Sequence, residues 1–186
     1  RINRVYRDIP GHNVVDGCRL TNMRQVIQNR MRREGRRCSC IRCREIRGDA
    51  KPMTSLVAND LVYDTATSTE HFLSFDTEAD QLAGYLRLSL PRDPETGLGI
   101  LALTGAAVVR EVHVYGRAQV LGARDHDRTQ PRGLGTRLMQ RAESLAREAG
   151  HERVAVIASV GTREWYSRLG YRIEDTYMIR DLPGEG

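Results

Sequence analysis

The residue types with the clearest chemistry are four cysteines, Cys18, Cys38, Cys40 and Cys43, all in the first quarter of the 186 residues. A secreted disulfide framework would spread its cysteines along the chain and follow an apolar signal region, and this sequence has neither feature. The clustering therefore predicts an intracellular metal site. Structural Zn²⁺ takes four nitrogen or sulfur ligands. Cys18 is the simplest choice of fourth ligand because it is the remaining cysteine, and His12 is the alternative. Free buried thiols and an iron–sulfur cluster are the alternatives.

Arginine is concentrated in the same part of the chain. The first 50 residues hold 13 Arg and no Lys against five acidic residues, although the whole chain carries only +5. Such a block favours a polyanionic partner such as nucleic acid, because guanidinium pairs bidentately with phosphate; a solvated helix face is the alternative. The candidates for phosphate contacts are Arg24, Arg30, Arg33, Arg36, Arg37 and Arg42, together with Arg32 and Arg44.

A second chemical signal is the glycine-containing segment at residues 130–135, which reads QPRGLG. Glycines expose backbone amides and allow a ligand to approach closely. An amphipathic pattern follows over residues 134–149, and a helix N-terminus carries a partial positive charge. Together these features predict a seat for a pyrophosphate group, reinforced by Arg132. The segment is weak evidence alone, since an ordinary helix-start turn has the same composition.

Two titratable residues lie on the strand that is expected to end near Tyr115. Glu111 and His113 have the same parity along it, so their side chains should share a face. Either could act as a base or activate water. A buried histidine satisfied by hydrogen bonds is the structural alternative.

The remaining patterns predict the elements that position these residues. Apolar residues at helical spacing predict a helix from about residue 21 to residue 34. Strand-like segments begin near residue 56, and the later order is strand, polar loop, helix, strand, short helix, strand. The expected strands include residues 154–160 and 171–182. This alternation predicts a mixed α/β (α+β) sheet.

The change from an Arg- and Cys-rich composition to strand-like patterns predicts two parts. They are a basic, cysteine-rich zinc-binding linker module over residues 1–52 and an α/β domain over residues 53–186. No apolar run approaches the ~20 residues that span a bilayer, so no transmembrane helix is expected. The chain starts without Met and without a signal region. We therefore expect a fragment of a longer, cytoplasmic protein.

The glycine segment, the expected strand at 154–160 and the sequence Leu-Gly-Tyr at 169–171 resemble the Gcn5-related N-acetyltransferase (GNAT) superfamily. Its motif Gln/Arg-x-x-Gly-x-Gly/Ala is matched by Gln130, Gly133 and Gly135. The resemblance implies a GNAT fold and acetyl-CoA as cofactor. It further implies that Tyr166 is the general acid for the departing thiolate, with core packing beside Trp165 as the alternative. The backbone of Val112 and Val114 would pair with pantetheine, and the pyrophosphate would meet the amides around Arg132, Gly133, Leu134, Gly135 and Thr136.

Five segments in the same order also resemble the C-terminal half of the catalytic subunits of Elongator, a family of tRNA wobble-uridine acetyltransferases. They are RDIP, TNMRQ, CSCIRCRE, VVREVHVYG and VGTREWYSRLGY. The resemblance to the bacterial and archaeal members implies zinc at the cysteines, tRNA as a partner, and acetyl-CoA cleavage in response to tRNA. It also implies a preceding radical-SAM domain that holds S-adenosylmethionine and an iron–sulfur cluster, absent from this chain, and possible accessory subunits.

Two other functions fit parts of the pattern. A stand-alone lysine or amine N-acetyltransferase would carry the same GNAT motifs. A non-catalytic, zinc-stabilised RNA-binding scaffold would explain the cysteines and arginines without any use of acetyl-CoA.

Overall fold

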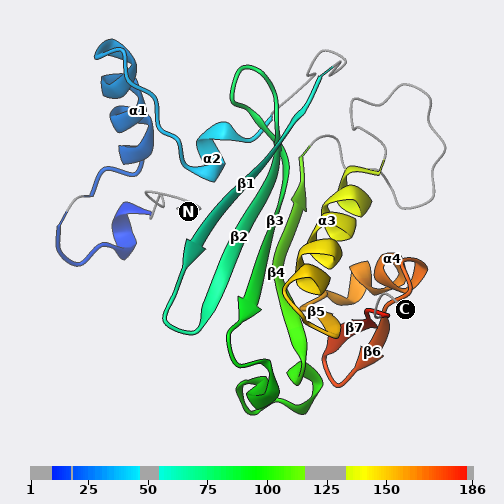
Figure 1. The fold of residues 1–186 in the computed structure, drawn as a ribbon. Helices are drawn as coiled ribbons and strands as arrows, with labels where there is room; N and C mark the ends of the chain where they lie inside the picture. Colours follow the sequence, from blue (N-terminus) through cyan, green and yellow to red (C-terminus); the bar gives the residue numbers. More distant parts are fainter. Residues whose placement is uncertain (1–9, 18, 47–54, 116–132, 184–186) are drawn as a thin grey trace. The chain divides into compact units, whose positions relative to one another are not determined.

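The structure, a computed structural model, describes residues 10–17, 19–46, 55–115 and 133–183 (Figure 1). The chain divides into two compact units, Arg1–Glu45 and Ile46–Gly186. The predicted boundary between residues 52 and 53 lies outside the described residues. Cys18, Gln130 and Arg132 also lie outside them.

The first unit contains the short 3₁₀ helix η1 (Gly11–Asn13) and the helices α1 (Met23–Arg33) and α2 (Ile41–Arg44). α1 agrees with the helix that was predicted from the apolar spacing. It ends at Arg33, and Gly35, two residues later, has a φ of +66°, the left-handed conformation that glycine adopts without strain. The amide of Arg36 then donates to the carbonyl of Met31 at 2.8 Å. This turn sends the chain back toward the cysteines.

The second unit is built on one seven-stranded sheet with the order β1-β2-β3-β4-β5-β7-β6. Only β4 and β5 run parallel, and every other neighbouring pair is antiparallel. The mixed sheet agrees with the predicted fold class. The strands are β1 (Val57–Asp64), β2 (Ser68–Asp76), β3 (Leu82–Pro91), β4 (Ala106–Val114), β5 (Arg153–Val156), β6 (Arg172–Glu174) and β7 (Tyr177–Asp181).

The connections around β4 and β5 set the shape of the site. A parallel pair needs a crossover, and here α3 (Leu134–Glu148) provides it. Leu134, Leu138 and Met139 are buried in the core against the sheet, as the amphipathic pattern predicted. The short helix α4 (Arg163–Arg168) follows β5, with the 3₁₀ turns η2 (Pro94–Gly99), η3 (Leu101–Leu103) and η4 (Val160–Thr162) elsewhere in the unit.

Two predicted strands differ from the structure. The segment predicted over 154–160 forms a strand only to Val156, where its pairing with β7 ends at Met178. The final predicted strand is two strands, because Asp175 has a φ of +53° and turns the chain between them. None of the helices in the described ranges combines the length and apolar composition needed to cross a bilayer.

Candidate functional site

The parallel strands β4 and β5 pair over only four residues, Ala106–Val109 with Arg153–Val156. β4 continues to Val114, so its last four residues, 111–114, are paired on the β3 side alone within the described part of the chain. Backbone amides and carbonyls along such an open edge can bind an extended ligand as an added strand would. Val112 and Val114 both lie on this edge, and their side chains pack against the core.

The first turn of α3 lies beside the end of this open edge. A Cβ built on Gly135 would lie 3.2 Å from the Trp165 ring and 3.7 Å from Cγ2 of Val114. Glycine is therefore the residue that allows α3, β4 and α4 to approach so closely. The structure brings together Val114 and Gly135, both predicted cofactor-binding residues, and the Trp165 ring lies against Gly135.

The N-terminus of α3 offers backbone donors. Gly133 occupies the N-cap position with φ of +79°, and no side chain among the described residues caps it. The first turn also contains no acidic residue. The amides of Leu134, Gly135 and Thr136 precede the first intrahelical donor, the amide of Arg137, which bonds to the carbonyl of Gly133 at 2.8 Å. These amides and the helix dipole favour an anion here.

Tyr166 lies in α4 and is buried. Its ring packs edge-on against Trp165 at 4.8 Å and against Tyr171 at 5.8 Å between centroids. Burial raises the pKa of Tyr166 to about 12. The phenol is therefore protonated, and available as a hydrogen-bond donor, throughout the physiological pH range.

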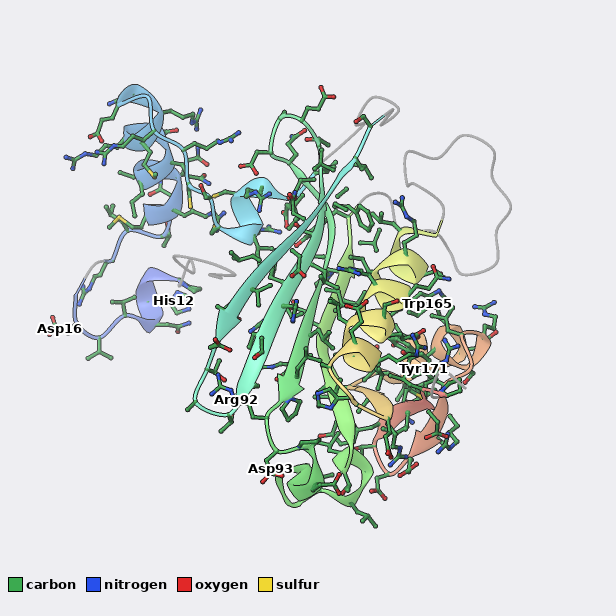
Figure 2. The ribbon with its side chains drawn as sticks, viewed as in Figure 1. His12, Asp16, Arg92, Asp93, Trp165 and Tyr171 are labelled. Carbon is green, nitrogen blue, oxygen red and sulfur yellow. The ribbon has the colours of Figure 1, made fainter. Side chains whose placement is uncertain are left out.

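Tyr171, which contacts the ring of Tyr166, belongs to a buried polar network. Tyr171, labelled in Figure 2, donates its hydroxyl proton to Oε1 of Glu143 at 2.8 Å. Nη1 of Arg180 contacts both oxygens of that carboxylate, at 3.0 and 2.9 Å. The amide of Tyr171 also donates to the carbonyl of Tyr166 at 3.1 Å. Burial, together with the neighbouring carboxylate, raises the pKa of Tyr171. The network joins α3, α4 and β7 around Tyr166.

Glu111 and His113 project from the face of the sheet opposite to α3. Gly84 faces Leu134 of α3, so the alternation of β3 turns Tyr85 to the other face, where it pairs with His113. Glu111 pairs with Arg87 two residues along the same regular ladder, so it lies on that same face. His113 Nε2 lies 3.8 Å from Oε1 of Glu111.

Tyr85 is a site residue that the sequence analysis did not identify. It is buried, and its hydroxyl donates to Oε1 of Glu111 at 2.5 Å. Burial, followed by the contact with Glu111, raises the pKa of Tyr85. Nη1 of Arg87 lies 3.7 Å from Oε2 of the same carboxylate. The alternating pattern over residues 84–88 placed Tyr85 and Arg87 on one face, which was the available signal.

In the first unit, the Sγ atoms of Cys38, Cys40 and Cys43 all lie within 4.8 Å of one another. Tetrahedral zinc with Zn–S bonds of about 2.3 Å separates its sulfur ligands by about 3.8 Å, so a small closure brings the three into range. These thiols could hold a metal ion. His12 lies in η1 and is not a member of the group (Figure 2).

The thiols also affect one another. The backbone of Cys40 donates to Cys38 and lowers its pKa, but burial and the thiols of Cys40 and Cys43 outweigh this effect and raise the pKa of Cys38. Two side chains of α1 are aimed at the third sulfur: Nη2 of Arg24 lies 3.2 Å and Nε2 of Gln28 lies 3.1 Å from Sγ of Cys43.

The predicted phosphate-binding arginines have different surroundings. Arg30 and Arg36 both pair with Glu34 and lower the pKa of that carboxyl, with Arg30 having the larger effect. Arg42 pairs with Glu45 at 2.7 Å, and Arg24 contacts Cys43. Arg33, in the last turn of α1, is exposed. These arginines therefore differ in whether they pair with an acidic side chain, contact a sulfur or are simply exposed.

Residues 41–171 match the acetyltransferase (GNAT) family. The chain belongs to this family. Membership implies acetyl-CoA as the acyl donor, and the open edge of β4 beside the glycine-led N-terminus of α3 gives a GNAT domain suitable backbone groups for it. The match includes β1 to β5, α3 and α4, it begins within the cysteine cluster, and it ends before β6 and β7.

Within the family, the chain is homologous to tRNA uridine(34) acetyltransferases and to Elongator complex protein 3. It is 38% identical to the tRNA uridine(34) acetyltransferase of Dehalococcoides mccartyi over 98% of this chain and 40% of that protein. Human Elongator complex protein 3 is 37% identical over 98% of this chain and 34% of its own length. The chain therefore spans well under half of these relatives.

A solved structure agrees with this relationship. The archaeal Methanocaldococcus infernus Elp3, solved with an N-terminal deletion, is 33% identical with a TM-score of 0.74. The alignment covers 96% of this GNAT chain and 43% of that one. Similarity thus extends over both compact units.

Proposed function

We propose that this chain is the acetyl-CoA-binding part of a tRNA wobble-uridine modifying enzyme, and that it cleaves acetyl-CoA in response to tRNA. The observation that carries the proposal is the meeting of α3, β4 and α4 at Gly135, beside the α3 N-terminal amides, which no side chain of the described residues caps. Homology over 98% of the chain to a tRNA uridine(34) acetyltransferase supports the choice of tRNA.

Acetyl-CoA supplies an acetyl group activated as a thioester. The amides of Leu134, Gly135 and Thr136 would bind its pyrophosphate, with Gly133 in the left-handed conformation that opens the helix end. Gln130 and Arg132 would contribute from the preceding segment. The backbone of Val112 and Val114 would hydrogen-bond to the pantetheine arm along the open edge of β4.

Tyr166 would donate a hydrogen bond to the sulfur as the C–S bond breaks, since its phenol remains protonated. Glu111 is the better candidate for orienting water, because Tyr85 and Arg87 hold its carboxylate in place. His113 would act beside it at 3.8 Å. Through this arrangement, a water proton would pass to the carboxylate while the phenol supports the leaving sulfur.

The first unit would bind metal and RNA. Cys38, Cys40 and Cys43 would hold Zn²⁺ together with Cys18, and the ion would fix the fold of this segment. Arginines near α1 and the cysteines would contact phosphates of tRNA. The radical-SAM domain with its S-adenosylmethionine and iron–sulfur cluster would precede this chain in the complete enzyme, which we expect to act in the cytoplasm.

The experiment that tests the proposal is an acetyl-CoA titration of Thr136→Glu, followed by the fluorescence of Trp165, the single tryptophan of the chain. A carboxylate in the first turn favours the helix itself through the dipole, but it repels the pyrophosphate. We expect at least a tenfold loss of affinity. Gln140→Glu adds the same charge at an exposed position one turn later and should bind as the wild type does.

Equal binding by Thr136→Glu and the wild type would contradict the proposed seat. A second titration adds tRNA or a lysine peptide to the wild-type chain with acetyl-CoA. Thioester cleavage that occurs with tRNA but not with the lysine peptide supports the proposal. Transfer of the acetyl group to lysine would make the chain an N-acetyltransferase. Absence of acetyl-CoA binding by folded protein would instead support the RNA-binding scaffold.

A further inference from the structure

One face of α1 lies against the cysteine cluster. This face and the three cysteines line a cavity of about 170 Å³. The helix residues that line it follow the i, i+3, i+4, i+7 spacing of a single face: Arg24, Ile27, Gln28 and Met31. Two of these four side chains are polar. Both polar groups converge on one sulfur, that of Cys43.

The chemistry of these two contacts suits a metal-bound thiolate. A neutral thiol is a weak hydrogen-bond acceptor, whereas ionised sulfur accepts strongly from charged donors. Three or four thiolates around one Zn²⁺ leave a net negative charge, which the Arg24 guanidinium at 3.2 Å would offset. The amide of Gln28 at 3.1 Å adds a second donor and fixes the direction of the sulfur.

The helix itself depends on such contacts. α1 has 11 residues and buries none of them, while Val26 and Ile27 are 44% and 38% exposed. Isolated helices shorter than about 12–15 residues are marginal in water. Side-chain hydrogen bonds from Arg24 and Gln28 to Cys43 link α1 to the cysteine loop, so the order of α1 should follow the state of that sulfur.

We propose that Arg24 and Gln28 are outer-sphere partners of the metal site that couple metal occupancy to the order of α1. The inference rests on the proposed metal site and goes beyond it. Metal binding would hold Cys43 in position, Cys43 would hold Arg24 and Gln28, and α1 would then present its exposed arginines on a fixed helix. Arg24 thereby serves the metal site and not the RNA.

The test measures Zn²⁺ affinity of the full 186-residue chain by competition with a chromophoric chelator. Arg24→Ala and Gln28→Ala should each weaken Zn²⁺ binding by about tenfold to a hundredfold, the usual effect of removing an outer-sphere partner. Arg33→Ala and Gln25→Ala are the matched controls, since both residues are exposed on the same helix. The controls should bind Zn²⁺ as the wild type does.

Hydrogen exchange of the Met23–Arg33 amides supplies the second measurement. Zn²⁺ should increase their protection in the wild type and in both controls, but much less in Arg24→Ala and Gln28→Ala. Alanine has the higher helix propensity, so lower protection in these variants cannot come from propensity.

Unchanged Zn²⁺ affinity in both test variants, or protection of α1 that ignores Zn²⁺, would overturn the inference while the metal site stands. Failure of the wild type to bind Zn²⁺ would remove the metal site and this inference together. Acetyl-CoA binding, followed by Trp165 in the same samples, reports separately on the cofactor seat.

Discussion

Replacing Arg180 by alanine tests the network behind Tyr166, because it leaves a buried carboxylate without its charged partner. Only 8% of the Glu143 side chain is exposed, and Arg180 contacts both of its oxygens. We expect the free energy of unfolding to fall by about 2–3 kcal/mol. The substitution removes the positive charge that faces Glu143. The hydrogen bond from Tyr171 to Glu143 remains.

The magnitude follows from the exposure of the two partners. Breaking a fully buried ion pair costs about 3–5 kcal/mol, since one charge stays behind without compensation. Arg180 is 38% exposed, so water can replace part of its interaction, and we lower the range to about 2–3 kcal/mol. For a domain of this size, that loss corresponds to a fall in Tm of about 4–12 °C.

Urea unfolding of Arg180→Ala, Glu143→Gln and the double variant measures the coupling. The double variant should be more stable than Arg180→Ala alone, because the neutral amide no longer needs a cation. Arg168→Ala removes an exposed pair with Glu164 at 3.9 Å and should cost under about 0.5 kcal/mol. A cost for Arg180→Ala as small as this control would refute the reasoning.

Two further predictions concern titratable groups. Burial lowers the pKa of His151 below its ordinary value of 6.5, with the backbone of Gly105 opposing the shift. The unfolded chain therefore takes up a proton first, so stability is complete above pH 6.5 and falls as the pH drops toward the folded-state pKa; urea midpoints at pH 7.5 and 5.5 should show a smaller difference in His151→Gln. Tyr166→Phe should lower the rate of thioester cleavage about 10²- to 10⁴-fold with little change in acetyl-CoA affinity, and equal rates would remove Tyr166 from the chemistry.

Local patterns predicted much of this molecule. The apolar spacing over residues 134–149 predicts α3. Gly133 and Gly135 mark the start of this helix, because each position requires glycine for a different physical reason. Gly133 has a positive φ, and Gly135 accommodates the Trp165 ring. The sheet strands were recognisable wherever alternation was clean.

Relations between strands were harder to predict. The contact of Tyr85 with Glu111 depends on the cross-strand register that pairs Arg87 with Glu111, and this register is not encoded in one strand alone. Similarly, Arg24 was predicted to contact phosphate from charge, whereas its guanidinium donates to Cys43, 19 residues away. Charge density indicates a class of partner, but it does not say which arginine is already engaged.

The pKa of Tyr166 also limits what this residue can do. An ordinary cysteine thiol has a pKa of about 8.5, so full proton transfer from a phenol of pKa about 12 to such a thiolate is uphill by about 5 kcal/mol. Tyr166 is therefore better suited to stabilise the departing sulfur by a hydrogen bond than to protonate it outright. The proton released when water attacks the thioester can then reach the thiolate later, through solvent. The rate should accordingly show no alkaline decrease from Tyr166 below about pH 11, whereas an acid with an ordinary phenol pKa would begin to lose its proton near pH 10.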